Sequence, residues 1–251
     1  MKRIACQNLT ISYQRHPVVH HLNVEFKVGT TNAIIGPNGA GKSSVLKAIL
    51  GETRIESGRV IIDGFSRSDI AYLPQVSEID SSLPFMVEDV LLLGLLHKVG
   101  LCGGIEKNSD AMIDGALCQV GMSGFRKRYI NELSRGQLQR VLLARIIMQN
   151  AMVIILDEPF NAMDNRTTDD LLQLIRKWQY EDGKTIIAVL HDLHQVACHF
   201  NYTLLIAQEL IDFGKTQNVL NRSNLERAYK SSFMWLNENE LCDLALQNTS
   251  A

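Results

Sequence analysis

The stretch "AIIGPNGAGKSS", residues 33–44, decides the fold that we expect for this chain. It contains the pattern G-x-x-x-x-G-K-[ST] directly after a strand-like apolar run and directly before the helical pattern SSVLKAILG. Glycines in such a turn allow backbone N–H groups to converge on phosphate oxygens, which a Cβ would obstruct. The stretch therefore predicts a phosphate-binding loop between a strand and a helix, which is a nucleotide site.

The loop also offers side chains for the phosphates and for a metal ion. Lys42 has the length to reach the β- and γ-phosphates, and the Ser43 hydroxyl can ligate Mg²⁺. We therefore expect a nucleoside triphosphate with Mg²⁺ as the ligand. The residues predicted to bind it here are Gly36, Pro37, Asn38, Gly39, Ala40, Gly41, Lys42, Ser43 and Ser44.

A second apolar run, "VIILDEP" at residues 153–159, ends in two carboxylates. Carboxylates at the C-terminal edge of a parallel sheet face the crevice where ligands bind. Asp157 is suited to order Mg²⁺ through its water shell, and Glu158 to polarise a water in line with the γ-phosphate. An acidic pair that caps a helix is the alternative, and the phosphate loop favours the catalytic interpretation.

Hydrophobic periodicity predicts an α/β chain. Residues 2–35 alternate as strands do, and three consecutive helical segments with no strand between them predict an inserted all-helical subdomain. We expect one domain over 1–251, with a catalytic core of 1–83 and 149–251 and a helical insert of 84–148. The predicted helices are 87–99, 110–122, 135–149, 167–181, LHQVACHF and much of the last thirty residues, and the further predicted strands are 57–64, 152–158, 184–191 and 202–208.

Composition excludes several classes of protein. A formal net charge of −2 gives no reason to expect a nucleic-acid partner. Five scattered cysteines without a C-x-x-C pair fit a reducing compartment better than a disulfide framework. The first residues lack the apolar core of a signal peptide, and the longest apolar runs are too short to span a bilayer. If the protein works at a membrane, we therefore expect a partner to hold it there.

The stretch "NELSRGQLQR", residues 131–140, separates this chain from other phosphate-loop proteins. A phosphate loop with a strand carboxylate also fits kinases, GTPases and helicases. In this stretch, however, a polar loop with a Ser and a Gly opens a second helix, and kinases and GTPases do not need such a feature. Here the chain resembles the ATP-binding-cassette (ABC) ATPase family, whose members have a signature near L-S-G-G-Q. The resemblance implies ATP hydrolysis and a RecA-like parallel sheet core with an N-terminal antiparallel β subdomain and an inserted helical subdomain. The signature residues are Leu133, Ser134, Arg135, Gly136 and Gln137.

The resemblance covers nearly the whole chain and implies roles for further residues. Gln75 in AYLPQ matches the Q-loop, and Asp164 in NAMD matches the D-loop. His191 in VLHD matches the switch histidine that hydrogen-bonds the γ-phosphate, and Tyr13 matches the aromatic residue that stacks on adenine. The implied catalytic residues are Glu158, His191 and Gln75, and the implied Mg²⁺ ligands are Ser43, Gln75 and Asp157.

The family also implies a partner for the signature. In ABC ATPases two cassettes associate head to tail, and each signature helix caps the γ-phosphate held by the other cassette. We therefore expect a second copy of this chain or a homologous cassette. Arg135 stands where the family usually has Gly, whereas Ser134 and Gly136 are kept. Arg135 is expected to point away from ATP or to add a positive charge at its edge.

Within the family, the resemblance favours a transporter subunit. Lys42 and Ser134 are 92 residues apart with no sustained heptads, unlike chromosome-type members, and ribosome-type members usually carry two cassettes. The stretches LPFMVEDVLLLG, DEPFNAMD and LLIAQELIDFG resemble cassettes of zinc and manganese importers, as does Phe160. The stretch VLHDLHQV also resembles siderophore-importer cassettes, so an iron-siderophore or haem importer is the alternative.

The same resemblance implies the surroundings of the protein. We expect an integral membrane permease to contact the surface near Gln75 and residues 76–90, and a substrate-binding protein to act through that permease. We expect the chain at the cytoplasmic face of a bacterial inner or plasma membrane, without a nucleic-acid partner. The remaining histidines lie on different predicted elements and are interpreted as structural: His16, His20, His21, His97, His194 and His199.

Overall fold

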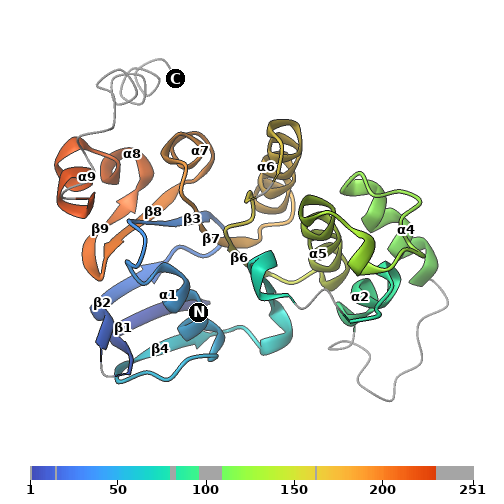
Figure 1. The fold of residues 1–251 in the computed structure, drawn as a ribbon. Coiled ribbons are helices and arrows are strands. Elements are labelled where there is room, and N and C mark those ends of the chain that lie inside the picture. The colour runs from blue at the N-terminus through green and yellow to red at the C-terminus, as the bar shows by residue number, and fades with distance from the viewer. Residues whose placement is uncertain (1, 15, 80–82, 96–108, 162, 230–251) are drawn as a thin grey trace. The chain divides into compact units, whose positions relative to one another are not determined.

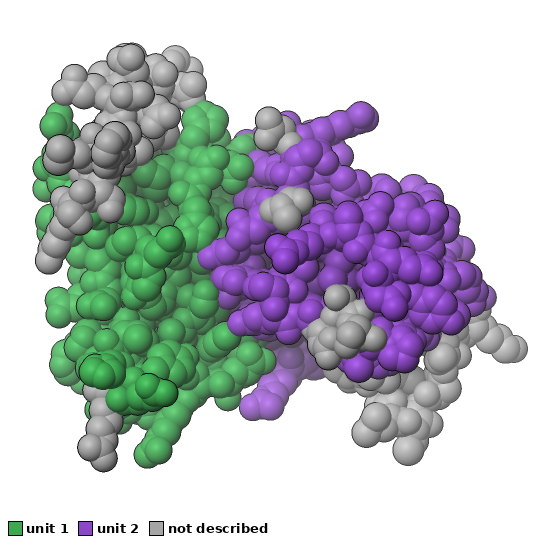
Figure 2. Space-filling model, viewed as in Figure 1, with its two compact units in different colours: residues 1–64, 185–251 green, residues 65–184 purple. Residues whose placement is uncertain are grey.

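The computed structural model describes residues 2–14, 16–79, 83–95, 109–161 and 163–229 (Figure 1). The chain divides into two compact units, which Figure 2 distinguishes by colour. Unit 1 comprises Met1–Gly64 and Thr185–Ala251, and unit 2 comprises Phe65–Lys184. Each unit contains parallel strand pairing together with helices, so the predicted α/β class is confirmed.

Unit 1 begins with a three-stranded antiparallel sheet in the order β2-β1-β4. The strands are β1 (Arg3–Tyr13), β2 (His16–Phe26) and β4 (Ser57–Asp63). Ile4 lies opposite Phe26 on one side and Ile62 on the other. The register shifts between Cys6 and Leu9, where Asn8 adopts a φ of 48°, as expected of a β-bulge. This sheet is the antiparallel β-structure that the family resemblance implied.

A second group of strands in unit 1 carries the phosphate loop. β3 (Thr31–Ile35) runs parallel to β7 (Thr185–Val189) and β8 (Tyr202–Ala207), and β9 (Glu209–Lys215) pairs antiparallel with β8. Every residue of β3 and β7 is buried, which is typical of parallel strands covered on both faces. The helices of the unit are α1 (Lys42–Leu50), α7 (Leu193–His199), α8 (Thr216–Val219) and α9 (Arg222–Tyr229).

Unit 2 combines one parallel strand pair with a helical cluster. β5 (Ile70–Leu73) pairs with β6 (Val153–Asp157), and Leu73 lies opposite Leu156. The helix α5 packs against both α2 and α4. The helices are α2 (Val87–Leu93), α4 (Ser109–Gln119), α5 (Arg135–Gln149) and α6 (Asn165–Tyr180), with single 3₁₀ turns η1 (Arg67–Asp69), η2 (Val76–Glu78) and η3 (Ile130–Glu132).

An ion-pair network joins two helices of this cluster. The guanidinium of Arg126 donates to Glu88 of α2 at 2.8 Å and also bonds Asp110 of α4. Hydrogen bonds from Lys127 and Arg126 lower the pKa of Glu88. Because Glu88 is only 14% exposed in its side chain, these charge-assisted bonds are partly shielded from water and orient α2 against α4.

The predicted elements agree with the structure in their interiors and differ at their ends. The helix over 135–149 is confirmed with the predicted bounds. α6 begins at Asn165 rather than 167, because the Asp164 carboxylate accepts a bond from the Thr167 N–H and so caps an earlier turn. α4 ends at Gln119 rather than 122, because Gly121 adopts a φ of 66°.

Two strands were not predicted, and both are short pieces without a strong alternating pattern. β5 has only four residues, and β9 is half-buried along most of its length and contains Asp212 and Gly214. The predicted helix over 87–99 and much of the predicted C-terminal helix extend outside the described residues. The predicted limits of the helical insert, 84–148, stay a prediction.

We predict that Gly36→Ala destabilises the protein far more than Gly39→Ala. At Gly36, with a φ of 152°, an added Cβ would lie 1.9 Å from the backbone oxygen of Ile206, and a backbone atom of β8 cannot yield cheaply. At Gly39, with a φ of 76°, no heavy atom lies within 4 Å of that Cβ. The Gly39 variant should therefore lose only the roughly 1 kcal/mol of a left-handed non-glycine residue, and the Gly36 variant more than about 2 kcal/mol.

Denaturant unfolding of both variants measures this difference. Equal midpoints for the two variants would show that the contact with Ile206 does not constrain the loop.

Candidate functional site

The phosphate loop is held by its own backbone. Gly41, with a φ of 90°, ends the loop, and α1 begins at Lys42. The Lys42 ammonium donates to the carbonyl oxygens of Gly36 at 2.9 Å and of Pro37 at 3.0 Å, and this side chain is buried. An added Cβ at Gly41 would lie 2.6 Å from the Val18 oxygen of β2. The glycines therefore let the loop lie against β2, and the lysine side chain crosses the loop to bond its first two carbonyl groups.

The rest of the predicted loop lies around this lysine. Ser43 and Ser44 are half-buried in the first turn of α1, so their hydroxyl groups lie at the helix start where an anion is favoured. Asn38 and Gly39 are exposed at the tip, whereas Ala40 is buried. The structure thus brings the predicted nucleotide-binding residues 36–44 together in one strand-to-helix turn.

Two tyrosines of unit 1 bear on the predicted nucleotide site, one as a predicted base-stacking residue and one through a bond to the phosphate loop. Tyr13 is 46% exposed, and its phenol oxygen lies 3.3 Å from the hydroxyl of Thr53. An exposed aromatic face fixed at its far end is suited to stack on a base. Tyr229, the last residue of α9, has a hydrogen bond with the backbone of Gly36, and burial raises the pKa of its phenol. Sequence reasoning missed Tyr229, because no motif connects it to the loop.

His191 lies at the same sheet edge as the phosphate loop. Ile34 of β3 is the register partner of Val189 of β7, and the Leu190 N–H donates to the Ile34 oxygen at 3.1 Å. Parallel strands end on one edge, so the segments that follow β3 and β7 leave the sheet together. His191 is exposed there, one residue before Asp192, which caps α7. His191 and the phosphate loop therefore follow neighbouring strands of unit 1, and the role of His191 as a switch histidine stays a prediction.

The corresponding edge of unit 2 carries the predicted carboxylates. Asp157 is the last residue of β6 and is fully buried. β5 is the parallel neighbour of β6, and Gln75 lies two residues after the end of β5. Gln75 precedes the 3₁₀ turn η2, and its amide oxygen lies 3.4 Å from the Ser77 hydroxyl. The unit thus places an amide oxygen and a buried carboxylate at one strand edge.

Glu158 has an unusual backbone conformation for its residue type. Its φ is 52°, in the left-handed region that non-glycine residues rarely adopt and that concentrates at functional sites. The Asn161 N–H donates to the Glu158 carbonyl at 3.3 Å, and the Asn161 amide donates to the Glu158 carboxylate. The turn after β6 therefore aims the predicted catalytic carboxylate. Asn161 was not singled out from the sequence, where it is one polar loop residue among several.

The signature forms the start of α5 and is held by a capping box. The Ser134 hydroxyl oxygen accepts from the Gln137 N–H at 3.2 Å, and the Gln137 amide oxygen accepts from the Ser134 N–H at 3.0 Å. Accepting this bond leaves the Ser134 hydroxyl its one donor. Gly136 is half-buried in this first turn, and Leu133 is the half-buried residue before it.

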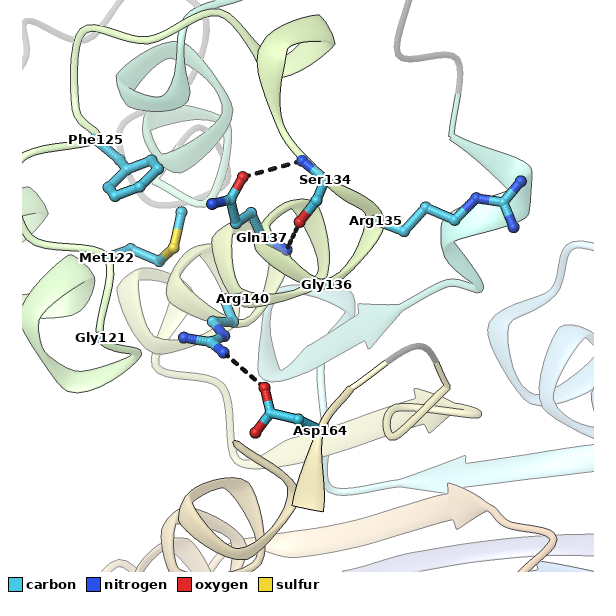
Figure 3. A pocket seen from close by; sticks show the side chains of 9 residues that line it. All are labelled: Gly121, Met122, Phe125, Ser134, Arg135, Gly136, Gln137, Arg140 and Asp164. Atoms are coloured by element: carbon cyan, nitrogen blue, oxygen red, sulfur yellow. Dashed lines mark hydrogen bonds and ion pairs between the residues drawn. The ribbon is translucent and has the colours of Figure 1, made fainter. Parts of the chain in front are cut away.

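A hollow of about 600 Å³ lies in front of this helix start (Figure 3). Its walls are the first turns of α5, the segment 121–125 and Asp164. Arg135 is exposed, and in Figure 3 its side chain extends away from Ser134 and Gln137. Within the chain, Arg135 therefore adds positive charge at the edge of the hollow rather than filling it.

Two consecutive residues of α5 connect the signature to the loop that follows β6. Gln139 is buried, and its amide donates to the Pro159 carbonyl at 3.1 Å. Arg140 forms an ion pair with Asp164 at 3.4 Å and bonds the Thr167 hydroxyl. Hydrogen bonds from the Thr167 backbone and hydroxyl, followed by Arg140, lower the pKa of Asp164. The D-loop residue is thereby tied to the signature helix, a link that sequence reasoning missed.

The donor atoms suit a hard cation. The side chains predicted to bind Mg²⁺ carry oxygen atoms, which this ion prefers. Ser43 offers a hydroxyl in unit 1, and in unit 2 Gln75 offers an amide and the fully buried Asp157 a carboxylate. Among the described residues no group of three His, Cys, Asp or Glu side chains could hold a metal ion. No helix in the described part of the chain has the length and apolarity to cross a membrane.

Comparison with known proteins places this geometry in a family. The family profile described as ABC transporter matches residues 19–161. The manganese transport system ATP-binding protein MntB of Listeria innocua is 38% identical over 227 residues, which cover 89% of this chain and 94% of that protein. The zinc transport system ATP-binding protein TroB of Treponema pallidum is 39% identical over 230 residues, covering 90% of this chain and 86% of that protein.

Solved structures agree in fold. An ABC transporter described as metal-chelate type, in an inward-facing conformation, has a TM-score of 0.79 and 29% identity, and covers 92% of this chain and 90% of that chain. A dimeric ATP-binding cassette in a post-hydrolysis state with ADP and phosphate has a TM-score of 0.75 and 26% identity, and covers 85% of this chain and 98% of that chain. With its phosphate loop, strand carboxylates and capped signature helix, the chain belongs to the ATP-binding subunits of the ABC transporter family and binds and hydrolyses ATP.

Proposed function

We propose that this chain powers an importer of a transition-metal ion, either zinc or manganese. The observation that carries the proposal is similarity over about nine-tenths of the chain to ATP-binding proteins of manganese and zinc transport systems. Phe160 after the strand carboxylates and the stretch LPFMVEDVLLLG support the same assignment. In this proposal the ion passes through a membrane permease supplied by a substrate-binding protein, and the chain supplies the energy.

Two cassettes form the complete ATP site in this proposal. The phosphate loop around Lys42 holds the phosphates of one ATP, and the α5 start of a second cassette closes over them. The hollow before α5 supports this role, because Ser134 and Gly136 line it and a ligand could approach them there. The dimeric form of a cassette 26% identical to this chain also supports it. The second cassette is a copy of this chain or a homologue.

Within that site we assign the chemistry to three side chains. Glu158, aimed by its left-handed backbone and by Asn161, orients and deprotonates the attacking water. His191 donates to the γ-phosphate from the edge it shares with the loop. Gln75 positions the water, and its position changes with bound nucleotide, which links nucleotide binding to the helical cluster.

Mg²⁺ fits the same proposal as the accompanying ion. Ser43, Gln75 and Asp157 would hold it, directly or through water, and it would neutralise charge on the β- and γ-phosphates. The residues themselves bind and orient the triphosphate, and the aromatic face of Tyr13 stacks on the adenine.

The permease contact is assigned to one surface of unit 2. Leu83 and Phe85 are 45% and 40% exposed, and Tyr129 is 40% exposed beside them. Backbone bonding joins the two segments, because the Ile130 N–H donates to the Phe85 oxygen at 2.9 Å. Large exposed apolar side chains that gather in this way mark interaction surfaces. Leu83 and Phe85 belong to residues 76–90 and Tyr129 lies next to them, and there a permease helix would hold the chain at the cytoplasmic face of the membrane.

We expect Glu158→Gln to keep ATP binding and to reduce turnover about 10²-fold or more, because the amide cannot accept the proton of water. Lys42→Ala should instead weaken nucleotide binding itself. Glu181→Gln, at an exposed end of α6, is the matched control and should behave as the wild type. Nucleotide binding and phosphate release by purified protein distinguish these outcomes, and near-normal hydrolysis by the Glu158→Gln variant would remove Glu158 from this role.

A tandem of two linked copies tests whether Ser134 acts on the other chain's ATP. With Lys42→Ala in one copy and Ser134→Arg in the other, both defects fall in one composite site and the second site stays intact. With Glu158→Gln added to block turnover, we expect about one occluded ATP per tandem. The control tandem carries both changes in the same copy, which damages both composite sites and should occlude none. The reverse pattern would mean that each chain completes its own site.

Deletion of the gene should make growth sensitive to chelation of zinc or manganese, because the permease would lose its energy source. Adding back the missing ion should restore growth, and so should the wild-type gene but not the Lys42→Ala gene. Growth and uptake of the radioactive ions measure this. A defect confined to media with iron-siderophore or haem as the iron source would favour the alternative importer class.

A further inference from the structure

Helix α7 presents a histidine and a cysteine side by side on its exposed face. His194 and Cys198 are four residues apart on Leu193–His199, and residues at that spacing are neighbours on a helix. Both are exposed, and the His194 Nε2 lies 3.7 Å from the Cys198 Sγ. These two side chains were not paired in the sequence analysis, where histidines were considered alone and cysteines only for disulfides.

The separation of the two atoms matches that of two ligands on one zinc ion. A tetrahedral zinc with a sulfur at about 2.3 Å and a nitrogen at about 2.0 Å holds these atoms about 3.5 Å apart. The observed 3.7 Å needs only a small side-chain adjustment. The helix therefore already holds the two ligand atoms near the separation that zinc needs, so binding would require little ordering of the protein.

The ligand types select among metals. A thiolate with an imidazole favours zinc and other borderline-soft ions, whereas manganese prefers oxygen ligands. The Asp192 carboxylate cannot readily join the pair, because its Oδ1 accepts from the His194 N–H at 2.8 Å and from the Gln195 N–H at 3.1 Å. Water would complete the coordination, as fits an exposed two-ligand site that releases its ion easily.

The position of the pair connects it to the ATP site. α7 follows β7 after only three residues, and His191 is the second of them. His194 follows His191 by three residues and is the second residue of the helix that Asp192 caps. An ion that bridges the first and second turns of α7 stiffens the helix directly attached to the switch histidine.

We propose that His194 and Cys198 form a zinc-binding site through which free zinc slows ATP hydrolysis. The binding part stands on the geometry of α7 alone, and the slowing rests on the role proposed above for His191. If the transporter carries zinc, the site would bind the transported ion after import. If the transporter carries manganese, the site would bind zinc and not the transported ion.

Protection of the thiol tests the binding part without ATP. The full-length, nucleotide-free protein is alkylated with and without zinc, and modification is read by mass spectrometry at the Cys198 peptide and the Cys118 peptide. We expect zinc to slow alkylation of Cys198 at least about tenfold, because the thiolate that reacts is the one that binds the metal. Exposed Cys118 of α4 is the internal control and should be unaffected, and manganese should protect neither.

Variants separate this site from other causes of protection. His194→Ala should abolish the protection of Cys198, whereas His16→Ala, at an exposed histidine of β2, should retain it. Equal protection in the two variants, or none in the wild type, would overturn the site. Retained folding of each variant is checked by its thermal unfolding midpoint.

ATP turnover tests the regulatory part. Zinc, added beyond the Mg²⁺ already present, should slow hydrolysis by the wild type and by Cys118→Ser, and His194→Ala and Cys198→Ser should be resistant. Thiol protection without any difference in turnover would overturn the regulation and leave the binding site standing. If the protein shows no ATP turnover at all, the proposed function fails, and the alkylation result still decides whether the site exists.

Discussion

The fixed strand-to-helix turn between β3 and α1 is the constraint on which the nucleotide chemistry depends. Its glycines allow the backbone to pass within contact of β8 at Ile206 and of β2 at Val18, closer than any Cβ would permit. The buried Lys42 ammonium then bonds two carbonyl groups of the same turn. The loop is thus organised before any phosphate arrives, which reduces the ordering cost of binding.

Helix α5 serves as the corresponding rigid element of unit 2. A capping box fixes its first turn, and the Gln139 and Arg140 side chains bind the two ends of the segment from Pro159 to Asp164. Glu158 immediately precedes that segment and has a strained backbone. A displacement of the signature would therefore act on the predicted catalytic carboxylate through hydrogen-bonded neighbours. In the proposed dimer, this gives closure over ATP a physical route to the reaction centre.

Each unit carries some of the residues that the sequence predicts to be functional. Unit 1 carries the phosphate loop and His191 on one strand edge, and unit 2 carries Gln75 and Asp157 on another. The exposed apolar residues Phe85 and Tyr129 belong to unit 2.

The motifs of the sequence were sufficient for the family and the phosphate loop, because both require particular residue types at fixed local spacing, whereas the roles of the catalytic residues stay predictions. The 135–149 helix was equally predictable, since a capping signal precedes an uninterrupted helical pattern. Tertiary structure alone decided the contacts of Tyr229 with Gly36, of Gln139 with Pro159 and of Arg140 with Asp164. These pairs join residues far apart in the chain through single hydrogen bonds, and neither periodicity nor local spacing carries information about which distant carbonyl or carboxylate a polar side chain will meet.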